Sequence, residues 1–302
     1  MRNKPQRWRN EVSVEAYWVQ GRITKGVGGH YSVMTAAGEF NCRARGLFRK
    51  HEITPLVGDL AEISIVDEAQ KTGFIKNILP RKNELNRPKV ANIDQVVVVC
   101  SIRPVVNFPV LDAFLITCEV QEVDAILCVN KIDLDTENNH KEIIGIYEMA
   151  QYWVVATSAE TGAGMDALRE RLMGKTSIFA GASGVGKSRI LNTLYPDLNL
   201  AIGDLSEKIG RGRHTTRHTS LIRVAPETYV VDSPGFTSLT IDHIPRRDLQ
   251  DYYPEFLDFQ FECFFTGCLH ITEHDCAVKE QVGITIHPQR YEQYKAFMEG
   301  RL

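Results

Sequence analysis

One segment constrains the fold of this chain more than any other. It follows the pattern G-x-x-x-x-G-K-S and reads Gly181-Ala182-Ser183-Gly184-Val185-Gly186-Lys187-Ser188. A β-type run over residues 177–180 precedes it, and a helical stretch beginning at Arg189 follows it. In such a strand–loop–helix unit the glycines let backbone N–H groups turn inward around a phosphate. The segment therefore predicts a nucleotide site in which Lys187 contacts the β- and γ-phosphates and Ser188 ligates Mg²⁺.

A second segment, Asn130-Lys131-Ile132-Asp133, follows a β-type run over residues 125–129 and indicates which base is bound. The Asp133 carboxylate can accept hydrogen bonds from guanine N1–H and the exocyclic amine, and adenine offers no such pair. Because a buried carboxylate left unpaired is costly, we expect GTP to be preferred over ATP by orders of magnitude. Asn130 and the Lys131 stem would support the base. Thr157-Ser158-Ala159 fits the loop that reinforces guanine recognition, although Ser158 also suits a helix N-cap.

Two further segments indicate the nucleotide-sensing switches. Asp232-Ser233-Pro234-Gly235 matches D-x-x-G, in which Asp232 would hold Mg²⁺ through water and the Gly235 amide would sense the γ-phosphate. The glycine- and arginine-rich stretch 210–218 lies where the first switch belongs, and Thr215 or Thr216, with Thr216 preferred, would ligate Mg²⁺.

The residue after D-x-x-G bears on catalysis. It is Phe236, which cannot orient a water by hydrogen bonding as the glutamine of Ras-like proteins does, so intrinsic hydrolysis should be slow. His214 is the nearest candidate for that role, with an RNA-contacting or merely solvated histidine as the alternative. The catalytic candidates are therefore Lys187, His214 and Gly235.

The chain order of these segments is permuted. The guanine motif precedes the phosphate loop, whereas ordinary small GTPases begin with the phosphate loop. Such permutation is tolerated because domain termini tend to lie close together at the surface. The sequence thus predicts a circularly permuted α/β GTPase domain over residues 94–237.

The flanking regions differ from this domain in pattern. Residues 1–10 are basic and indicate a mobile arm, and residues 11–80 contain five short β-type runs broken by glycine, which is typical of an OB-fold barrel that binds RNA. Residues 81–93 form a connector. Residues 238–302 are predicted to form a mainly helical zinc-binding domain that ends in an amphipathic helix over residues 288–301.

The zinc prediction rests on Cys263, Cys268, His270 and Cys276, spaced C-x₄-C-x-H-x₅-C. Four such ligands close a tetrahedral Zn²⁺ site and leave no position for a catalytic water, so one structural Zn²⁺ is expected. His274 could compete with His270. The other four of the seven cysteines occur singly, as reduced core cysteines do.

The permuted order, the barrel and the cysteine cluster together resemble the RsgA (YjeQ) family of small ribosomal subunit biogenesis GTPases. Four stretches match the same family: Val57-Gly58-Asp59, Asn92-Ile93-Asp94-Gln95, Gly212-Arg213-His214-Thr215-Thr216 and Asp232-Ser233-Pro234-Gly235-Phe236. The resemblance covers nearly the whole chain. It implies a GTPase stimulated by the small ribosomal subunit, acting late in its maturation and binding its rRNA. Arg217 departs from the third threonine common in the family.

Composition agrees with these expectations. Residues 1–90 carry 16 Lys and Arg against 9 Asp and Glu, whereas the net charge of the whole chain is -3. The basic N-terminal part favours a polyanionic partner such as RNA. The alternative is that the excess of Lys and Arg forms only a solvated surface. The chain shows no signal peptide and no membrane-spanning run, so we expect a cytoplasmic monomer that binds GTP and GDP. Two alternatives remain: an RNA-binding switch with little turnover, and a GTPase of a non-ribosomal process.

Overall fold

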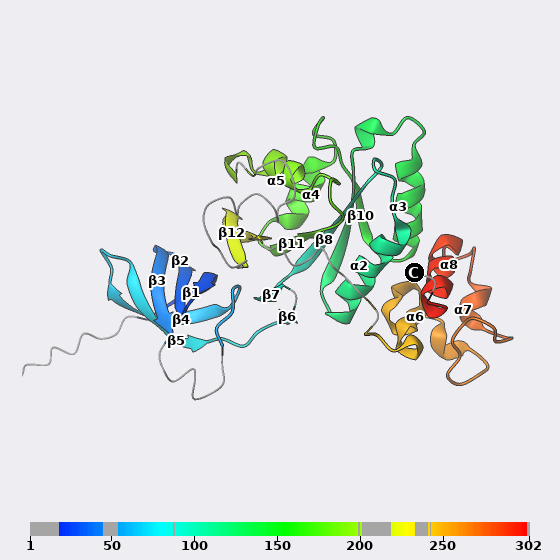
Figure 1. Ribbon diagram of the computed structural model, residues 1–302, viewed down its shortest axis with the longest axis horizontal. Helices are drawn as coiled ribbons and strands as arrows, with labels where there is room; N and C mark the ends of the chain where they lie inside the picture. The colour runs from blue at the N-terminus through cyan, green and yellow to red at the C-terminus, as the bar shows by residue number, and fades with distance from the viewer. Residues whose placement is uncertain are drawn as a thin grey trace, which may run out of the picture. The chain divides into compact units, whose positions relative to one another are not determined.

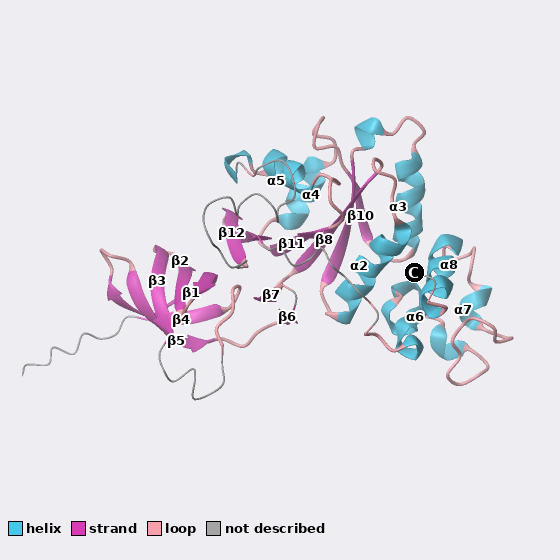
Figure 2. Ribbon diagram, in the orientation of Figure 1, coloured by secondary structure: helices cyan, strands magenta, loops and turns pink. Residues whose placement is uncertain are grey.

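The computed structural model describes residues 18–44, 54–86, 88–198, 200, 219–232, 241 and 243–300 (Figure 1). The chain divides into two compact units, Met1–Pro80 and Arg81–Leu302. Strands dominate the first unit, and the second contains both strands and helices (Figure 2). No helix in the described ranges is both long and apolar enough to cross a bilayer.

The first unit is the expected five-stranded barrel. Its strands are β1 (Trp18–Val27), β2 (His30–Thr35), β3 (Gly38–Ala44), β4 (Leu60–Asp67) and β5 (Thr72–Ile78). They pair in the order β1-β2-β3-β5-β4, and an antiparallel β1–β4 ladder closes the barrel. Alternate residues point inward, so Ile23, Val33, Phe40, Ile63 and Ile75 form a core without solvent exposure.

The second unit begins with a short hairpin, β6 (Glu84–Asn86) and β7 (Lys89–Ala91), within the segment expected to be a plain connector. Its main sheet has the order β10-β9-β8-β11-β13-β12. Five strands run parallel and only β12 is antiparallel. These strands are β8 (Gln95–Ser101), β9 (Asp124–Asn130), β10 (Trp153–Ala156), β11 (Thr176–Ala180), β12 (Ser220–Ala225) and β13 (Thr228–Asp232).

Helices cover both faces of this sheet (Figure 1). On one face α4 (Met165–Leu172) and α5 (Lys187–Leu194) pack their leucines against Val97, Val99 and Ile126. On the other lie α2 (Phe108–Val120) and α3 (Asn139–Met149). Because both faces are buried, β8 is apolar almost throughout rather than alternating. The α/β prediction is confirmed, with α4, β12 and the hairpin as additional elements.

The C-terminal part is mainly helical, as expected. It contains α6 (Pro254–Leu257), α7 (Ala277–Glu280) and α8 (Pro288–Met298), with 3-10 turns at Arg246–Tyr252 (η3) and Gln260–Glu262 (η4). Tyr253, Phe256 and Tyr294 form an aromatic core with centroid distances of 5.0–5.2 Å. Ile116 of α2 belongs to the same cluster, so this part packs directly onto the α/β sheet's helical layer.

A buried ion network reinforces that contact. The Arg290 guanidinium of α8 lies 2.7 Å from Asp112 of α2 and donates from Nε to Glu255 of α6 at 2.7 Å. The Tyr147 hydroxyl also donates to Asp112, at 2.7 Å. Burial opposes the charge of Arg290, yet the two carboxylates hold its pKa well above the usual value. The network therefore joins α2, α6 and α8 through one fixed geometry.

Candidate nucleotide site and metal centre

The phosphate loop occupies the turn between β11 and α5. Gly181 has φ of +131°, and a Cβ there would collide with the Val99 carbonyl of β8. Gly186 has φ of +104°, and a Cβ there would collide with the Asn130 side-chain amide. Only glycine meets both the conformational and the spatial demands at these two positions.

Lys187 turns its side chain into this loop. Its ammonium donates to the carbonyls of Gly181 at 2.8 Å and Ala182 at 2.9 Å. Lys187 and Ser188 are both buried in the first turn of α5. Helix N-terminal N–H groups and a buried ammonium make this loop suited to an anion.

The expected guanine motif lies against the same loop. Asn130, at the end of β9, donates to the Val185 carbonyl at 2.9 Å. Lys131 adopts a left-handed conformation with φ of 63°, and its ammonium donates to the Gly184 carbonyl at 2.6 Å. It also donates to the Arg103 carbonyl at 2.8 Å, a contact that the sequence did not indicate. The bonds from Asn130 and Lys131 to the phosphate loop join segments more than 50 residues apart in the chain.

The third expected loop completes a pocket. The Ser158 hydroxyl donates to the Asp133 carboxylate and also accepts from the Thr161 N–H at 3.1 Å, which closes a turn. Ser158 is not a helix N-cap, because the N-cap residue of the following helix α4 is Gly164. Thr157 donates to Asn130 Oδ1 at 3.3 Å. The resulting pocket has a volume of about 380 Å³. Its lining comprises Asn130, Lys131, Asp133, Leu134, Ala159, Glu160, Gly186 and Arg189.

Sequence reasoning missed Glu160, which forms an ion pair with Arg189 between the loop after β10 and α5. Both side chains line the pocket. Its position directly after Thr157-Ser158-Ala159 was the available signal, but the partner was not predictable, because the pairing depends on how α5 lies against that loop.

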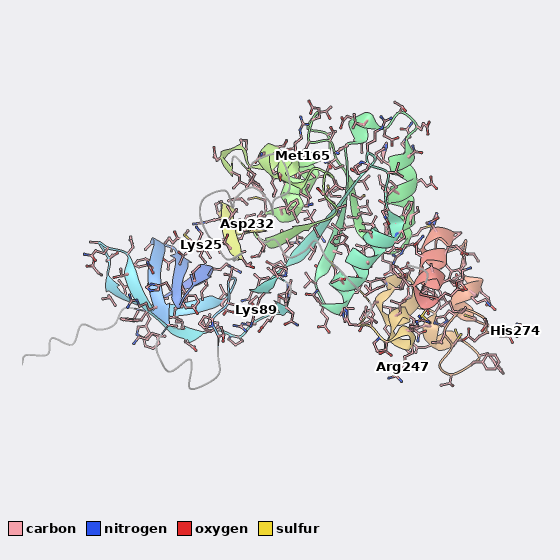
Figure 3. All side chains as sticks on the ribbon, in the orientation of Figure 1. Lys25, Lys89, Met165, Asp232, Arg247 and His274 are labelled. Carbon is pink, nitrogen blue, oxygen red and sulfur yellow. The ribbon has the colours of Figure 1, made fainter. Side chains whose placement is uncertain are left out.

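Asp232 ends β13, the strand beside β11, and so lies at the same edge of the sheet as the phosphate loop (Figure 3). Parallel strands bring their carboxyl ends together, which is where ligands bind in such sheets. Three other predicted site residues, His214, Thr215 and Thr216, lie outside the described residues, as does Gly235.

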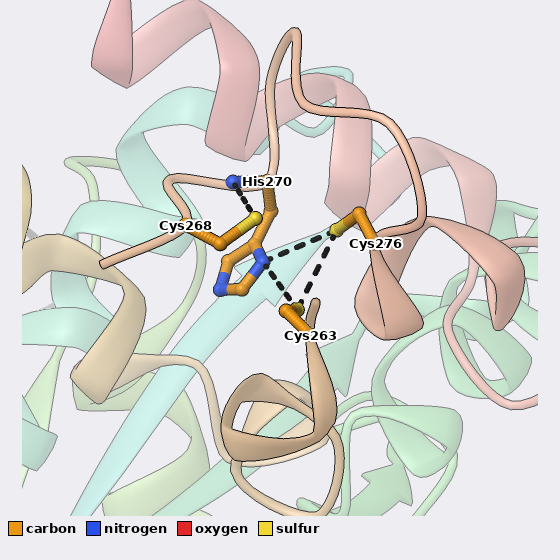
Figure 4. Close-up of side chains that lie close together, drawn as sticks. All are labelled: Cys263, Cys268, His270 and Cys276. Atoms are coloured by element: carbon orange, nitrogen blue, oxygen red, sulfur yellow. Dashed lines mark hydrogen bonds between the residues drawn. The ribbon is translucent and has the colours of Figure 1, made fainter. Parts of the chain in front are cut away.

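The predicted zinc ligands come together in the C-terminal part. The ligand atoms of Cys263, Cys268, His270 and Cys276 all lie within 4.8 Å of one another (Figure 4). His270 Nδ1 is 3.3 Å from Cys276 Sγ and 3.5 Å from Cys263 Sγ, and these two sulfurs are 3.8 Å apart. A tetrahedron with Zn–S bonds of about 2.3 Å has edges of about 3.8 Å, so this donor set fits Zn²⁺. His274 is exposed and lies outside the cluster (Figure 3).

Surrounding contacts fix the loop that carries these residues. The Glu273 carboxylate accepts from the N–H groups of Leu269, Ile271 and Thr272 at 2.8–3.0 Å. Burial opposes the charge of Glu273, and these hydrogen bonds outweigh it and lower its pKa. The Tyr291 hydroxyl of α8 donates to the His270 carbonyl at 2.7 Å. The ligand geometry is thus held by carboxylate and tyrosine contacts around it.

A phosphate loop between strand and helix, with the guanine motif preceding it in the chain, defines a circularly permuted GTPase. A family model described as RsgA GTPase matches residues 78–242, and one described as RsgA N-terminal domain matches residues 20–75. The chain belongs to the RsgA GTPase family and is a GTP-hydrolysing enzyme.

Individual relatives agree with this assignment. The small ribosomal subunit biogenesis GTPase RsgA of Caldanaerobacter subterraneus is 47% identical, over 91% of this chain and 93% of that protein. The crystal structure of YjeQ from Thermotoga maritima is 36% identical with a TM-score of 0.80, covering 94% of this chain and 98% of that one. The crystal structure of YloQ, described as a circularly permuted GTPase, is 33% identical with a TM-score of 0.76, covering 97% of each chain.

Proposed function

We propose that this chain hydrolyses GTP on the small ribosomal subunit during the biogenesis of that subunit. The observation that supports the nucleotide site best is the pair of side chains, Asn130 and Lys131, that donate to phosphate-loop carbonyls. Their hydrogen bonds hold the Asn130–Asp133 segment against the phosphate loop, which supports one nucleotide site built from both segments. The ribosomal part rests on relatives at 44–47% identity named small ribosomal subunit biogenesis GTPase RsgA.

Each site residue has a proposed task. The Asp133 carboxylate, oriented by Ser158, accepts from the guanine base, and Asn130 and Lys131 hold the pocket against the phosphate loop. The residues proposed to contact GTP are Asn130, Lys131, Asp133, Thr157, Ser158, Ala159, Gly181, Ala182, Ser183, Gly184, Val185, Gly186, Lys187, Ser188 and Arg189.

The phosphate end needs a cation and a positioned water. Ser188, Asp232 and either Thr215 or Thr216 would hold Mg²⁺, which neutralises developing phosphate charge when bound. Lys187 places its ammonium inside the loop, where it balances charge on the transferred phosphoryl group. We assign the Gly235 amide to γ-phosphate sensing and His214 to orienting the attacking water.

The Cys263, Cys268, His270 and Cys276 cluster would hold one structural Zn²⁺. Burial lowers the pKa of the His270 imidazole, which favours the neutral form that a metal ligand requires. We further propose division into an arm (1–10), an OB-fold RNA-binding domain (11–80), a connector (81–93), a GTPase domain (94–237) and a zinc-binding domain (238–302).

The barrel carries features suited to RNA. A groove of about 280 Å³ is lined by His30, Asn41, Arg43 and Phe74 among others, and exposed Trp18 lies under the Lys76 ammonium at 5.9 Å. Aromatic faces beside basic groups suit single-stranded nucleic acid. The proposed partners are the small subunit with its rRNA, and GTP and GDP, for a monomer in the cytoplasm.

The test is nucleotide hydrolysis by the purified protein with and without small ribosomal subunits, using ATP and Lys187→Ala as controls. We expect slow GTP turnover that subunits accelerate strongly, with ATP ignored. His214→Ala should lose the acceleration without losing GTP affinity. GTP binding with negligible turnover under both conditions would favour an RNA-binding switch, an outcome that Phe236 makes worth testing. Turnover unaffected by subunits would favour a non-ribosomal process.

A further inference from the structure

The C-terminal part exposes large apolar side chains within nine consecutive residues. Phe261 is 87% exposed, Phe264 75%, Phe265 47% and Leu257 45%. We name these four residues the aromatic patch. Scattered exposed apolar residues are ordinary, but three phenylalanines so close together mark an interaction surface.

Hydrogen bonds and ring contacts hold the aromatic patch in a defined conformation. Successive turns close with Phe259 N–H donating to the Phe256 carbonyl and Glu262 N–H donating to the Phe259 carbonyl, both at 2.9 Å. Phe264 donates its N–H to the Asp275 carbonyl at 3.2 Å. The Phe264 and Phe265 rings meet edge to face with centroids 5.0 Å apart. Cys263, which lies between Phe261 and Phe264 in the sequence, belongs to the Cys/His cluster that could hold a metal ion.

In sequence, the segment that carries the aromatic patch is acidic between Arg247 and Lys279. Residues 248–278 contain seven carboxylates and no Lys or Arg. Of these seven, Asp251, Asp258, Glu262 and Asp275 are exposed. A nucleic-acid surface gains its affinity from Lys and Arg on phosphates, and carboxylates oppose that contact. Aromatic side chains framed by carboxylates instead complement an apolar protein surface bordered by basic residues.

We propose that the aromatic patch docks on a basic protein partner, which presents an apolar pocket bordered by Lys and Arg. The inference rests on the proposed function, because the partner is taken to be a protein of the small ribosomal subunit. Phe261 and Phe264 insert as anchors, and Asp258 and Glu262 pair with the basic border. Stacking of these rings on RNA bases is the rival reading, and the acidic frame disfavours it.

Photocrosslinking identifies the class of partner. A benzophenone amino acid replaces Phe264 in the full-length protein, which is then loaded with a non-hydrolysable GTP analogue. The loaded protein is bound to purified small subunits and irradiated. We expect a crosslink to a subunit protein, mapped by mass spectrometry. The matched control carries the same group at Ile284, which is 70% exposed but lies outside the aromatic patch, and should give no such crosslink.

An affinity measurement completes the test. Phe261→Ser/Phe264→Ser/Phe265→Ser should weaken co-sedimentation with subunits about tenfold, the loss expected for interface anchors, and Ile284→Ser should not. Retained zinc content and melting temperature would show that the triple variant folds. A crosslink to rRNA, a crosslink to a second copy, or no crosslink would overturn the proposal, as would unchanged affinity of the triple variant. Failure of the wild-type protein to sediment with subunits would instead count against the proposed function.

Discussion

At the scale of single residues, we propose that the choice of base depends on Asp133. Its carboxylate accepts the Ser158 hydroxyl and lines the pocket between the guanine motif and α5. Xanthine carries a carbonyl where guanine carries the exocyclic amine. In Asp133→Asn the side-chain amide N–H can donate a hydrogen bond to this carbonyl. We expect this variant to lose at least about 100-fold in GDP affinity and to gain affinity for xanthosine diphosphate. Competition against a fluorescent nucleotide measures both.

The matched control is Ser158→Ala, which removes one hydrogen bond to the carboxylate but leaves its charge. It should weaken GDP binding by about tenfold or less, without any gain for the xanthine nucleotide. If Asp133→Asn left the affinities for both nucleotides unchanged from the wild type, the base would have to lie elsewhere.

The Glu160–Arg189 ion pair is expected to slow nucleotide release. Because it joins the loop after β10 to α5 beside the pocket, Glu160→Gln should speed GDP dissociation about two- to fivefold, the modest effect of a partly exposed pair. Stopped-flow displacement measures the rate. In a double-mutant cycle with Arg189→Gln the two effects should not add. Strictly additive effects would mean that the side chains act separately.

Much of the nucleotide site was predictable from local patterns, because glycine, lysine and aspartate spacing encodes the phosphate loop and the guanine motif directly. The carboxyl ends of β9 and β11 lie at the same edge of the sheet, on either side of β8, because the strands are parallel. The Arg103 carbonyl that accepts from Lys131 was not predictable, since a backbone contact leaves no residue-type signal.

At the scale of elements, the Asp112–Arg290–Glu255 network joins three helices. Arg290→Met should destabilise the protein by about 3–5 kcal/mol near neutral pH, because two carboxylates stay buried without their cation. Denaturant unfolding followed by circular dichroism measures the change. Arg290→Met combined with Asp112→Asn and Glu255→Gln should recover most of the loss, since no unpaired charge remains.

The stability of the Arg290→Met variant should also depend on pH in a way that follows from the titration of Asp112. Burial raises the pKa of Asp112, and Arg290 opposes that shift in the wild type. Without the guanidinium, the folded-state pKa lies above the unfolded value of about 3.9. A carboxyl of this kind takes up a proton on folding, so the variant should be relatively most stable below that value and lose stability as pH rises through the raised pKa. An unchanged pH profile would contradict this account.

We propose that a metal ion bound by the Cys263, Cys268, His270 and Cys276 cluster fastens the segment between η4 and α7. Chelation should lower the melting temperature and increase hydrogen exchange over residues 263–282, because a site that fixes a loop contributes its binding free energy to folding. His270→Ala should bind less zinc and behave like the chelated protein. The exposed His274 supplies the control, and His274→Ala should retain a full zinc content. Equal zinc content in both variants would show that His270 is not a ligand.

Among the elements, the barrel strands and the helix α8 followed from periodicity and glycine placement. The hairpin β6–β7 was not predictable, because strands of three residues are too short to show an alternating pattern. The strand β12 was not predictable either, because its partly polar sequence does not alternate clearly. The Arg290 network was hidden for a different reason: a charged residue in an amphipathic helix is expected on the solvent face.

At the scale of the whole molecule, the chain divides at Pro80 into a barrel with its own core and a larger unit that holds both the nucleotide site and the metal cluster. We expect residues 81–302, produced alone, to fold and to bind GDP within about threefold of the full-length affinity, because every described residue proposed to contact the nucleotide lies within them. The fragment should nevertheless associate less tightly with small subunits, since the basic front of the chain is removed. Isothermal titration with GDP and sedimentation with subunits measure the two properties separately. Loss of GDP affinity in a folded fragment would show that the barrel contributes to the nucleotide site, whereas unchanged subunit association would remove the RNA-binding role from the barrel.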